Sequence, residues 1–185
     1  FCAMRPPGHH AETSRAMGFC LFNQVAIAAR YAQARYDAER VAVIDFDVHH
    51  GNGTQEIFWP HESLFYGSTH QMPLYPGTGS VQETGVGNIF NAPLRAGDGG
   101  EQFRDAMMSR ILPALRNFGP DIILISAGFD AHHLDPLGGL SLTDDDFHWI
   151  TRELMAIADD AAQGRVVSTL EGGYSLQGLA SGSAA

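Results

Sequence analysis

The chain has 185 residues, of which 44% are hydrophobic and 17% are charged. This composition is typical of a folded globular domain and excludes an intrinsically disordered chain. The formal net charge of −10 argues against binding to a phosphate backbone, so we expect no direct contact with nucleic acid. The chain contains no apolar run long enough to span a bilayer, and we therefore expect no association with a membrane.

The two cysteines, Cys2 and Cys20, are too few for a disulfide framework, which predicts reduced thiols and a cytoplasmic location. The chain lacks an initiator Met, and a dense motif already begins at Arg5. We therefore expect one domain over residues 1–185 that is a fragment of a longer domain, truncated at its N-terminus.

Helices and strands are predicted to alternate along the chain. An alanine-rich segment over residues 23–36 predicts a helix. Three short apolar runs, at 41–48, 121–126 and 165–170, are rich in β-branched residues and predict parallel strands that are buried on both faces.

Two further helices are indicated by apolar side chains at helical spacing. One pattern runs from Phe103 to Leu115 and the other from Phe147 to Ile157. Thr143 or Asp144 is a suitable N-cap for the last helix, and Gly164 a suitable end. The stretch 70–100 is rich in Gly and Pro and is expected to be an irregular, functional loop region. Together these patterns predict an α/β fold with a mostly parallel central sheet.

Polar residues follow the predicted strands at their carboxyl ends, where open α/β sheets bind ligands. The first strand leads into Asp45, Asp47 and His49, which alternate along the chain and should share one face. The second strand ends on Asp130. Burial of such charges without a partner is costly, and a bound metal ion would remove the cost.

Two carboxylates and one imidazole, from Asp47, His49 and Asp130, suit a catalytic zinc ion with an open coordination position. Ferrous iron and cobalt would accept the same ligands. A structural zinc ion is disfavoured, because such sites favour cysteine ligands.

Two other groups point to catalysis. His9 and His10 follow Pro-Pro-Gly on a rigid loop, which favours general acid–base chemistry beside the metal, with Asp45 and Asn52 as candidate partners for the imidazoles. Tyr174 follows Gly172 and Gly173, which allow a close approach to a ligand, and its phenol could donate to a developing oxyanion.

Seven motifs, in this order, resemble the histone deacetylase superfamily, which includes bacterial acetylpolyamine amidohydrolases. They are RPPGHHAE at 5–12, GFCLFN at 18–23, DFDVHHGNGTQ at 45–55, YPGTG at 75–79, SAGFDAH at 126–132, DPLGG at 135–139 and LEGGY at 170–174. The resemblance is strongest to the class II branch and its bacterial histone deacetylase-like amidohydrolases. It implies the arginase/deacetylase-like three-layer fold and a deacetylase catalytic domain.

The resemblance also implies a role for each matching residue. Asp47, His49 and Asp130 match the ligands of one catalytic Zn²⁺ ion. His9, His10 and Tyr174 match the catalytic residues, with Asp45 behind His9 and Asn52 behind His10. Further matches concern substrate binding and a structural cation, usually K⁺. The substrate-binding positions are Gly18, Phe19, Leu137, Gly172 and Gly173, with Tyr75 near the rim; the cation positions are Asp45, Asp47, His49, Ser68 and Thr69.

The implied reaction is hydrolysis of an acetyl amide by metal-activated water. His10 would deprotonate the water, and His10 or His9 would protonate the leaving amine. The expected substrate is an acetylated lysine peptide or an acetylated polyamine, and a homo-oligomer is possible. An arginase-like ureohydrolase with two manganese ions, and a binding protein without catalysis, are the alternatives.

Overall fold

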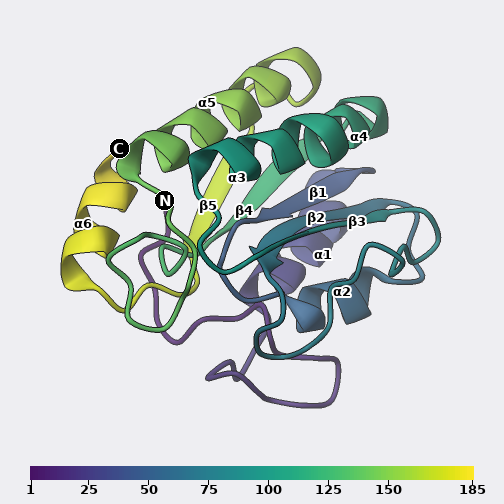
Figure 1. Cartoon of the computed structure of the whole chain (residues 1–185). Coiled ribbons are helices and arrows are strands. Elements are labelled where there is room, and N and C mark those ends of the chain that lie inside the picture. The colour runs from purple at the N-terminus through teal and green to yellow at the C-terminus, as the bar shows by residue number, and fades with distance from the viewer.

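A five-stranded sheet forms the centre of the structure, which is a computed structural model that describes residues 1–185 (Figure 1). The strands are β1 (Val41–Asp45), β2 (Leu64–Gln71), β3 (Ile89–Leu94), β4 (Ile122–Ala127) and β5 (Val166–Leu170). They lie in the order β3-β2-β1-β4-β5, and every neighbouring pair is parallel. The predicted α/β fold with a parallel sheet is therefore confirmed.

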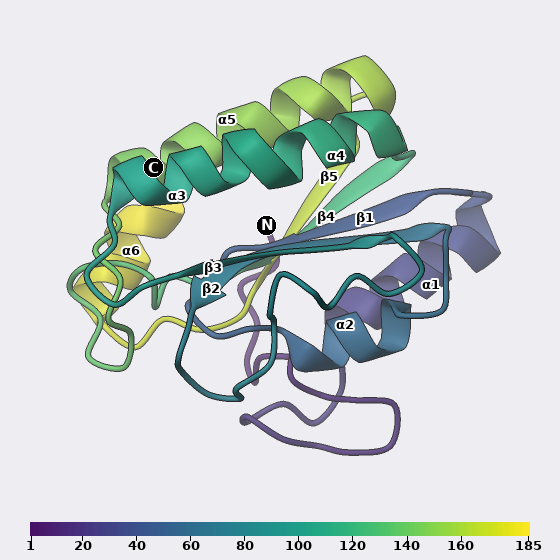
Figure 2. The same cartoon turned by 45° about the vertical axis from the view of Figure 1, so that its right-hand side comes forward.

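Helices cover both faces of the sheet and complete three layers. They are α1 (Gln24–Tyr36), α2 (Asn52–Phe58), α3 (Gly100–Ala106), α4 (Leu112–Phe118), α5 (Asp144–Ala161) and α6 (Leu176–Ala184). In both views α1 and α2 lie on one side of the sheet, while α3, α4 and α5 lie on the other (Figures 1 and 2). A π-helical turn, Met107–Ile111, joins α3 to α4.

The central strand β1 has all five residues buried, because its side chains alternate between two hydrophobic cores. Ala42 and Ile44 belong to a core of 26 buried residues that includes α3, α4 and α5. Val41 and Val43 belong to a smaller core of 11 buried residues with α1. A strand covered on both faces needs apolar side chains at successive positions, which explains the apolar run that precedes Asp45.

The predicted helix ends agree with the structure. Thr143 is the N-cap of α5, and its backbone N–H donates to the Asp146 carboxylate over 3.0 Å. Beyond the helix, Gly164 has a φ of +73°, and its N–H donates to the carbonyl of Ala158 over 2.9 Å. The repeat from Phe103 to Leu115 is helical, although the π-helical turn interrupts the regular spacing.

Several elements differ from the prediction. The first strand ends at Asp45 and does not continue to residue 48. β2, β3 and α2 were not predicted, and β3 lies inside the stretch 70–100 that we expected to be irregular. The sequence of β3 contains Pro93, which an edge strand tolerates, and this residue obscured the strand pattern.

The order of the strands determines where a ligand can bind. From β1 the chain runs outward to β2 and β3 on one side, and β4 and β5 lie on the other side of β1. The connections therefore diverge at the carboxyl ends of β1 and β4, which is the position where open α/β sheets bind ligands.

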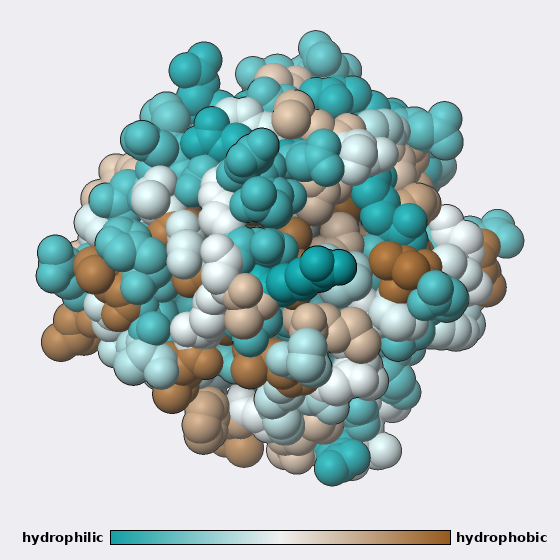
Figure 3. All heavy atoms as spheres, viewed as in Figure 1, coloured by the Kyte–Doolittle hydropathy of each residue, from teal (hydrophilic) through white to brown (hydrophobic).

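On the face drawn in Figure 3, hydrophobic residues form small groups between hydrophilic ones. No helix in the structure combines the length and the apolar character that crossing a membrane requires.

Candidate metal centre and active site

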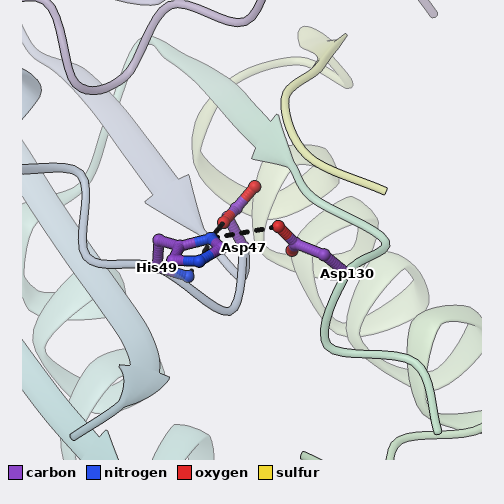
Figure 4. Close-up of side chains that lie close together, drawn as sticks. All are labelled: Asp47, His49 and Asp130. Atoms are coloured by element: carbon purple, nitrogen blue, oxygen red, sulfur yellow. Dashed lines mark hydrogen bonds and ion pairs between the residues drawn. The ribbon is translucent and has the colours of Figure 1, made fainter. Parts of the chain in front are cut away.

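Three side chains converge where β1 and β4 end (Figure 4). His49 Nδ1 lies 3.2 Å from Asp47 Oδ1 and 3.1 Å from Asp130 Oδ2. One donor atom from each residue lies within 4.8 Å of the other two. The structure thus brings together the three ligands that were predicted from sequence.

The physical reason for this grouping differs from the predicted one. We expected Asp45, Asp47 and His49 to alternate along one strand, but the strand ends at Asp45 and a turn follows. Within the turn, Asp45 Oδ1 accepts the N–H of Asp47 over 3.1 Å, and Asp47 Oδ1 accepts the N–H of His49 over 2.8 Å. Each carboxylate therefore fixes the backbone that carries the next ligand.

The charges of the three ligands fit a cation. Asp47 and Asp130 are at most 1% exposed. Burial, together with the charge of Asp47, raises the pKa of Asp130 to about 7. Burial lowers the pKa of His49, but its hydrogen bonds to Asp130 and Asp47 outweigh this effect and raise that pKa to about 10. The space between the two carboxylates therefore favours positive charge, as a divalent metal ion would supply.

The backbone around the ligands leaves room only for glycine at position 172. A Cβ atom on Gly172 would overlap the carboxylates of Asp130 and Asp47. Its N–H donates to Asp47 Oδ2 over 2.7 Å, which ties the segment after β5 to the metal ligands. The residues present therefore fit a metal ion bound by two carboxylates and one imidazole.

The tandem histidines lie beside the ligands, each with a partner on its Nδ1 atom. His9 Nδ1 is 2.9 Å from Asp45 Oδ2, and His10 Nδ1 is 2.9 Å from Asn52 Oδ1. The amide of Asn52 donates from Nδ2 to Glu12 over 2.7 Å, so its oxygen faces His10. Because an amide oxygen can only accept, Nδ1 of His10 carries the proton and Nε2 has the free lone pair.

The two imidazoles differ in charge although their rings are only 4.1 Å apart. Burial lowers the pKa of His9, but the charges of Asp45 and Asp47 outweigh burial and raise it well above its usual value. Burial and the charge of His9 lower the pKa of His10 to about 3. Near neutral pH, His9 is thus a cation and His10 a neutral base.

Tyr174 follows the two glycines and lies at the same cavity. Burial and the charges of Asp130 and Asp47 raise its pKa, so the phenol remains a hydrogen-bond donor. Gly173 has a φ of +132°, which favours glycine, and its carbonyl accepts from Arg5 Nη2 over 2.7 Å. The Arg5 guanidinium lies 5.5 Å from the centre of the Tyr174 ring.

A cavity of about 340 Å³ opens beside the ligands. It is lined by Pro7, His9, His10, Gly18, Phe19, Asp47, His49, Tyr75, Leu137, Gly172 and Tyr174. Four of the five predicted substrate-binding residues therefore lie in its wall: Gly18, Phe19, Leu137 and Gly172. Tyr75 also lines the cavity, whereas Gly173 does not.

The residues expected to bind a structural cation lie on β1, in the turn that follows it, and on β2. Ser68 and Thr69 are buried on β2, and Asp45 pairs with Ser68 across the sheet. The hydroxyl of Ser68 lies 2.9 Å from His70 Nδ1. The K⁺ ion itself stays a prediction.

Sequence reasoning gave no role to Glu171, a buried carboxylate that follows β5 directly. Its Oε2 atom accepts the N–H groups of Gly8 and His9 over 2.6 and 3.1 Å, and its Oε1 accepts the Ser126 hydroxyl over 3.0 Å. Glu171 therefore holds the loop that carries the tandem histidines. Its position directly after a strand, which it shares with the end of the strand that leads to Asp130, was the sequence feature that could have indicated a role.

Comparison with known proteins shows the family of the chain. Residues 1–185 match the histone deacetylase domain. The chain is 48% identical to rice histone deacetylase 10, chloroplastic, over 98% of the chain and 42% of that protein. It is 43% identical to a probable deacetylase of Archaeoglobus fulgidus, over 96% of the chain and 50% of that protein. The solved HDA15 HD domain aligns with a TM-score of 0.91 at 42% identity, covering 97% of this chain and 52% of that one.

The chain belongs to the histone deacetylase family. The predicted superfamily and the deacetylase-like fold are thus confirmed. The chain spans about half the length of the relatives it matches.

Proposed function

We propose that this protein is a zinc-dependent amidohydrolase that removes acetyl groups from acetyl-lysine side chains or from a small acetylated amine. The observation that carries the proposal is the grouping of Asp47, His49 and Asp130 beside a cavity that His10 and Tyr174 line. Membership of a deacetylase family supports hydrolysis of an amide. Zinc is our choice among the metals that suit two carboxylates and one imidazole.

Asp47, His49 and Asp130 would hold the metal ion, which when bound supplies a Lewis acid for the carbonyl and lowers the pKa of a water molecule. His10 is the general base, because its ring lines the cavity and its Nε2 keeps a free lone pair while Asn52 holds Nδ1. The hydroxyl of Tyr174 donates to the negative charge that develops on the carbonyl oxygen.

The cationic His9 stabilises negative charge near the reacting atoms, with Asp45 fixing its orientation. His10, once protonated, can return its proton to the leaving amine. The aromatic and aliphatic side chains of Phe19, Tyr75 and Leu137 suit the methylene chain of an acyl-lysine or acyl-polyamine.

The arginase-like alternative requires a second metal ion with further carboxylate ligands. The structure has one group of three potential ligands, Asp47, His49 and Asp130. Metal analysis separates the two proposals: one zinc ion per chain supports the deacetylase, and two manganese ions would support the ureohydrolase.

The test compares hydrolysis of an acetyl-lysine peptide with hydrolysis of acetylputrescine, with zinc and after chelation. We expect metal-dependent turnover of at least one substrate. In Tyr174→Phe, kcat should fall by a factor on the order of 10² to 10³, as expected when one oxyanion donor is lost. Full activity of Tyr174→Phe would contradict the assigned role, and activity on neither substrate would contradict the proposed function.

The wider properties remain predictions. They are a structural K⁺ ion, a homo-oligomer, a cytoplasmic location, and no direct contact with nucleic acid or membrane. Both cysteines are free, with Cys20 buried and Cys2 exposed.

A further inference from the structure

Asp135 connects two loops of the cavity through three backbone N–H groups. Its Oδ2 atom accepts from Tyr174 over 2.7 Å and from Ser175 over 3.1 Å. Its Oδ1 atom accepts from Leu137 over 2.9 Å. The residue is 8% exposed, so these bonds are largely shielded from water.

The loops that Asp135 joins carry two different parts of the site. Tyr174 and Leu137 both line the cavity. The backbone before Tyr174 contains Gly172 and Gly173, and glycine adds conformational freedom that must be restrained if the hydroxyl is to have one position. Asp135 accepts the two N–H groups that immediately follow these glycines, and these hydrogen bonds therefore restrain Tyr174.

We propose that Asp135 is a positioning residue that sets the Tyr174 hydroxyl and the Leu137 wall relative to each other. This inference rests on the proposed function. Three donors converge on one side chain, and a carboxylate, which has only acceptor atoms, satisfies all of them. An amide of the same shape cannot, because its NH₂ group would face at least one N–H donor.

Two substitutions separate the effect of Asp135 on Leu137 from its effect on Tyr174. In Asp135→Asn, the amide oxygen should stay with the two donors at Tyr174 and Ser175, and the NH₂ group should repel Leu137. KM should then rise roughly tenfold while kcat changes by less than about threefold. In Asp135→Ala both loops are released, and kcat should fall by a factor on the order of 10², because small displacements of catalytic groups are costly.

Asp146→Ala is the matched control. Asp146 is also a buried carboxylate that accepts a backbone N–H, but its partners are Thr143 and Arg104. This control should lower the melting temperature and leave kcat and KM of the folded protein within about twofold. The proposal would be overturned if Asp135→Ala, like Asp146→Ala, left kcat and KM of the folded protein nearly unchanged.

A double variant tests whether Asp135 acts through the tyrosine. In a Tyr174→Phe background, Asp135→Ala should lower kcat by less than about threefold, because the hydroxyl it positions is already absent. An equal loss in both backgrounds would contradict the proposal.

Hydrogen exchange keeps this test separate from the proposed function. In the full-length protein, the amides of Leu137, Tyr174 and Ser175 should lose protection in Asp135→Ala but not in Asp146→Ala. If the wild-type protein hydrolyses no substrate, the proposed function fails while exchange still measures the restraint. Unchanged protection of these amides would overturn the positioning role by itself.

Discussion

At the scale of single residues, the tandem histidines show how neighbours with the same chemistry acquire different states. His9 faces the carboxylate of Asp45, whereas His10 faces the neutral amide of Asn52. A carboxylate favours the imidazolium form, and an amide oxygen only fixes the tautomer. The surroundings of each imidazole therefore determine its state: nearby carboxylates make His9 the cation, and burial beside that cation keeps His10 neutral.

Replacing Asn52 by Asp tests this assignment. An added negative charge beside Nδ1 should raise the pKa of His10 from about 3 toward neutrality. His10 must be neutral to act as a base, so activity is lost as pH falls through its pKa, and the acidic limb of the kcat profile should move to higher pH.

Asn117→Asp is the control for the added charge, because Asn117 lies on the exposed side of α4, before β4 begins. Its pH profile should match that of the wild-type protein. An acidic limb that stays in place in Asn52→Asp would show that Asn52 does not set the state of the base.

Sequence reasoning predicted the side chains that gather at the candidate metal centre, but it missed residues that bind the backbone around them. The ligands and both imidazoles were predicted because their residue types are unusual at the end of an apolar strand. Glu171 and Asp135 received no role, because they bind backbone N–H groups of loops. Which N–H groups lack partners depends on how the loops fold, and a sequence pattern does not contain this information.

At the scale of elements, the buried strands β1 and β4 were predictable because both faces are covered and each strand begins with four consecutive apolar residues. β2 was missed because its end is polar: Ser68, Thr69 and His70 are all buried in hydrogen-bonded surroundings. In a sequence, a run of such polar residues is typical of a loop. Their burial depends on partners from the segment after β2.

The contact between β2 and that segment predicts a pH-dependent stability. His70 Nε2 donates to the carbonyl of Gly79 over 2.9 Å, and burial lowers the pKa of His70 to about 4. The unfolded chain takes up a proton near pH 6.5, but the folded chain does so only near pH 4. The contribution of His70 is thus fully present above pH 6.5 and is lost as pH falls toward 4.

His70→Gln retains a donor for Gly79 but cannot be protonated. Between pH 7 and pH 4.5, its free energy of unfolding should fall by less than that of the wild-type protein, by on the order of 2 kcal/mol. Urea unfolding at several pH values measures this difference. His148→Gln, at an exposed position of α5, should keep the wild-type slope, and a wild-type slope in His70→Gln would refute the assignment.

At the scale of the whole molecule, the sheet collects negative charge at one edge. Four buried carboxylates, Asp45, Asp47, Asp130 and Glu171, lie at or beyond the carboxyl ends of β1, β4 and β5. The net charge of −10 adds to the potential that a cation meets at this edge. Burying these charges costs stability, and only part of that cost is offset by His9 and His49.

A bound metal ion should therefore stabilise the fold as well as complete the site. A ligand that binds only the folded state adds about 2.7 kcal/mol when its free concentration is 100 times Kd. We expect the melting temperature to rise by several degrees with zinc and to return to its starting value with a chelator. In His49→Ala this shift should be largely lost, because one of three ligands is gone, whereas exposed His148→Ala should keep it. An equal zinc shift in His49→Ala would place the ion elsewhere and would contradict the ligand set on which the proposed chemistry depends.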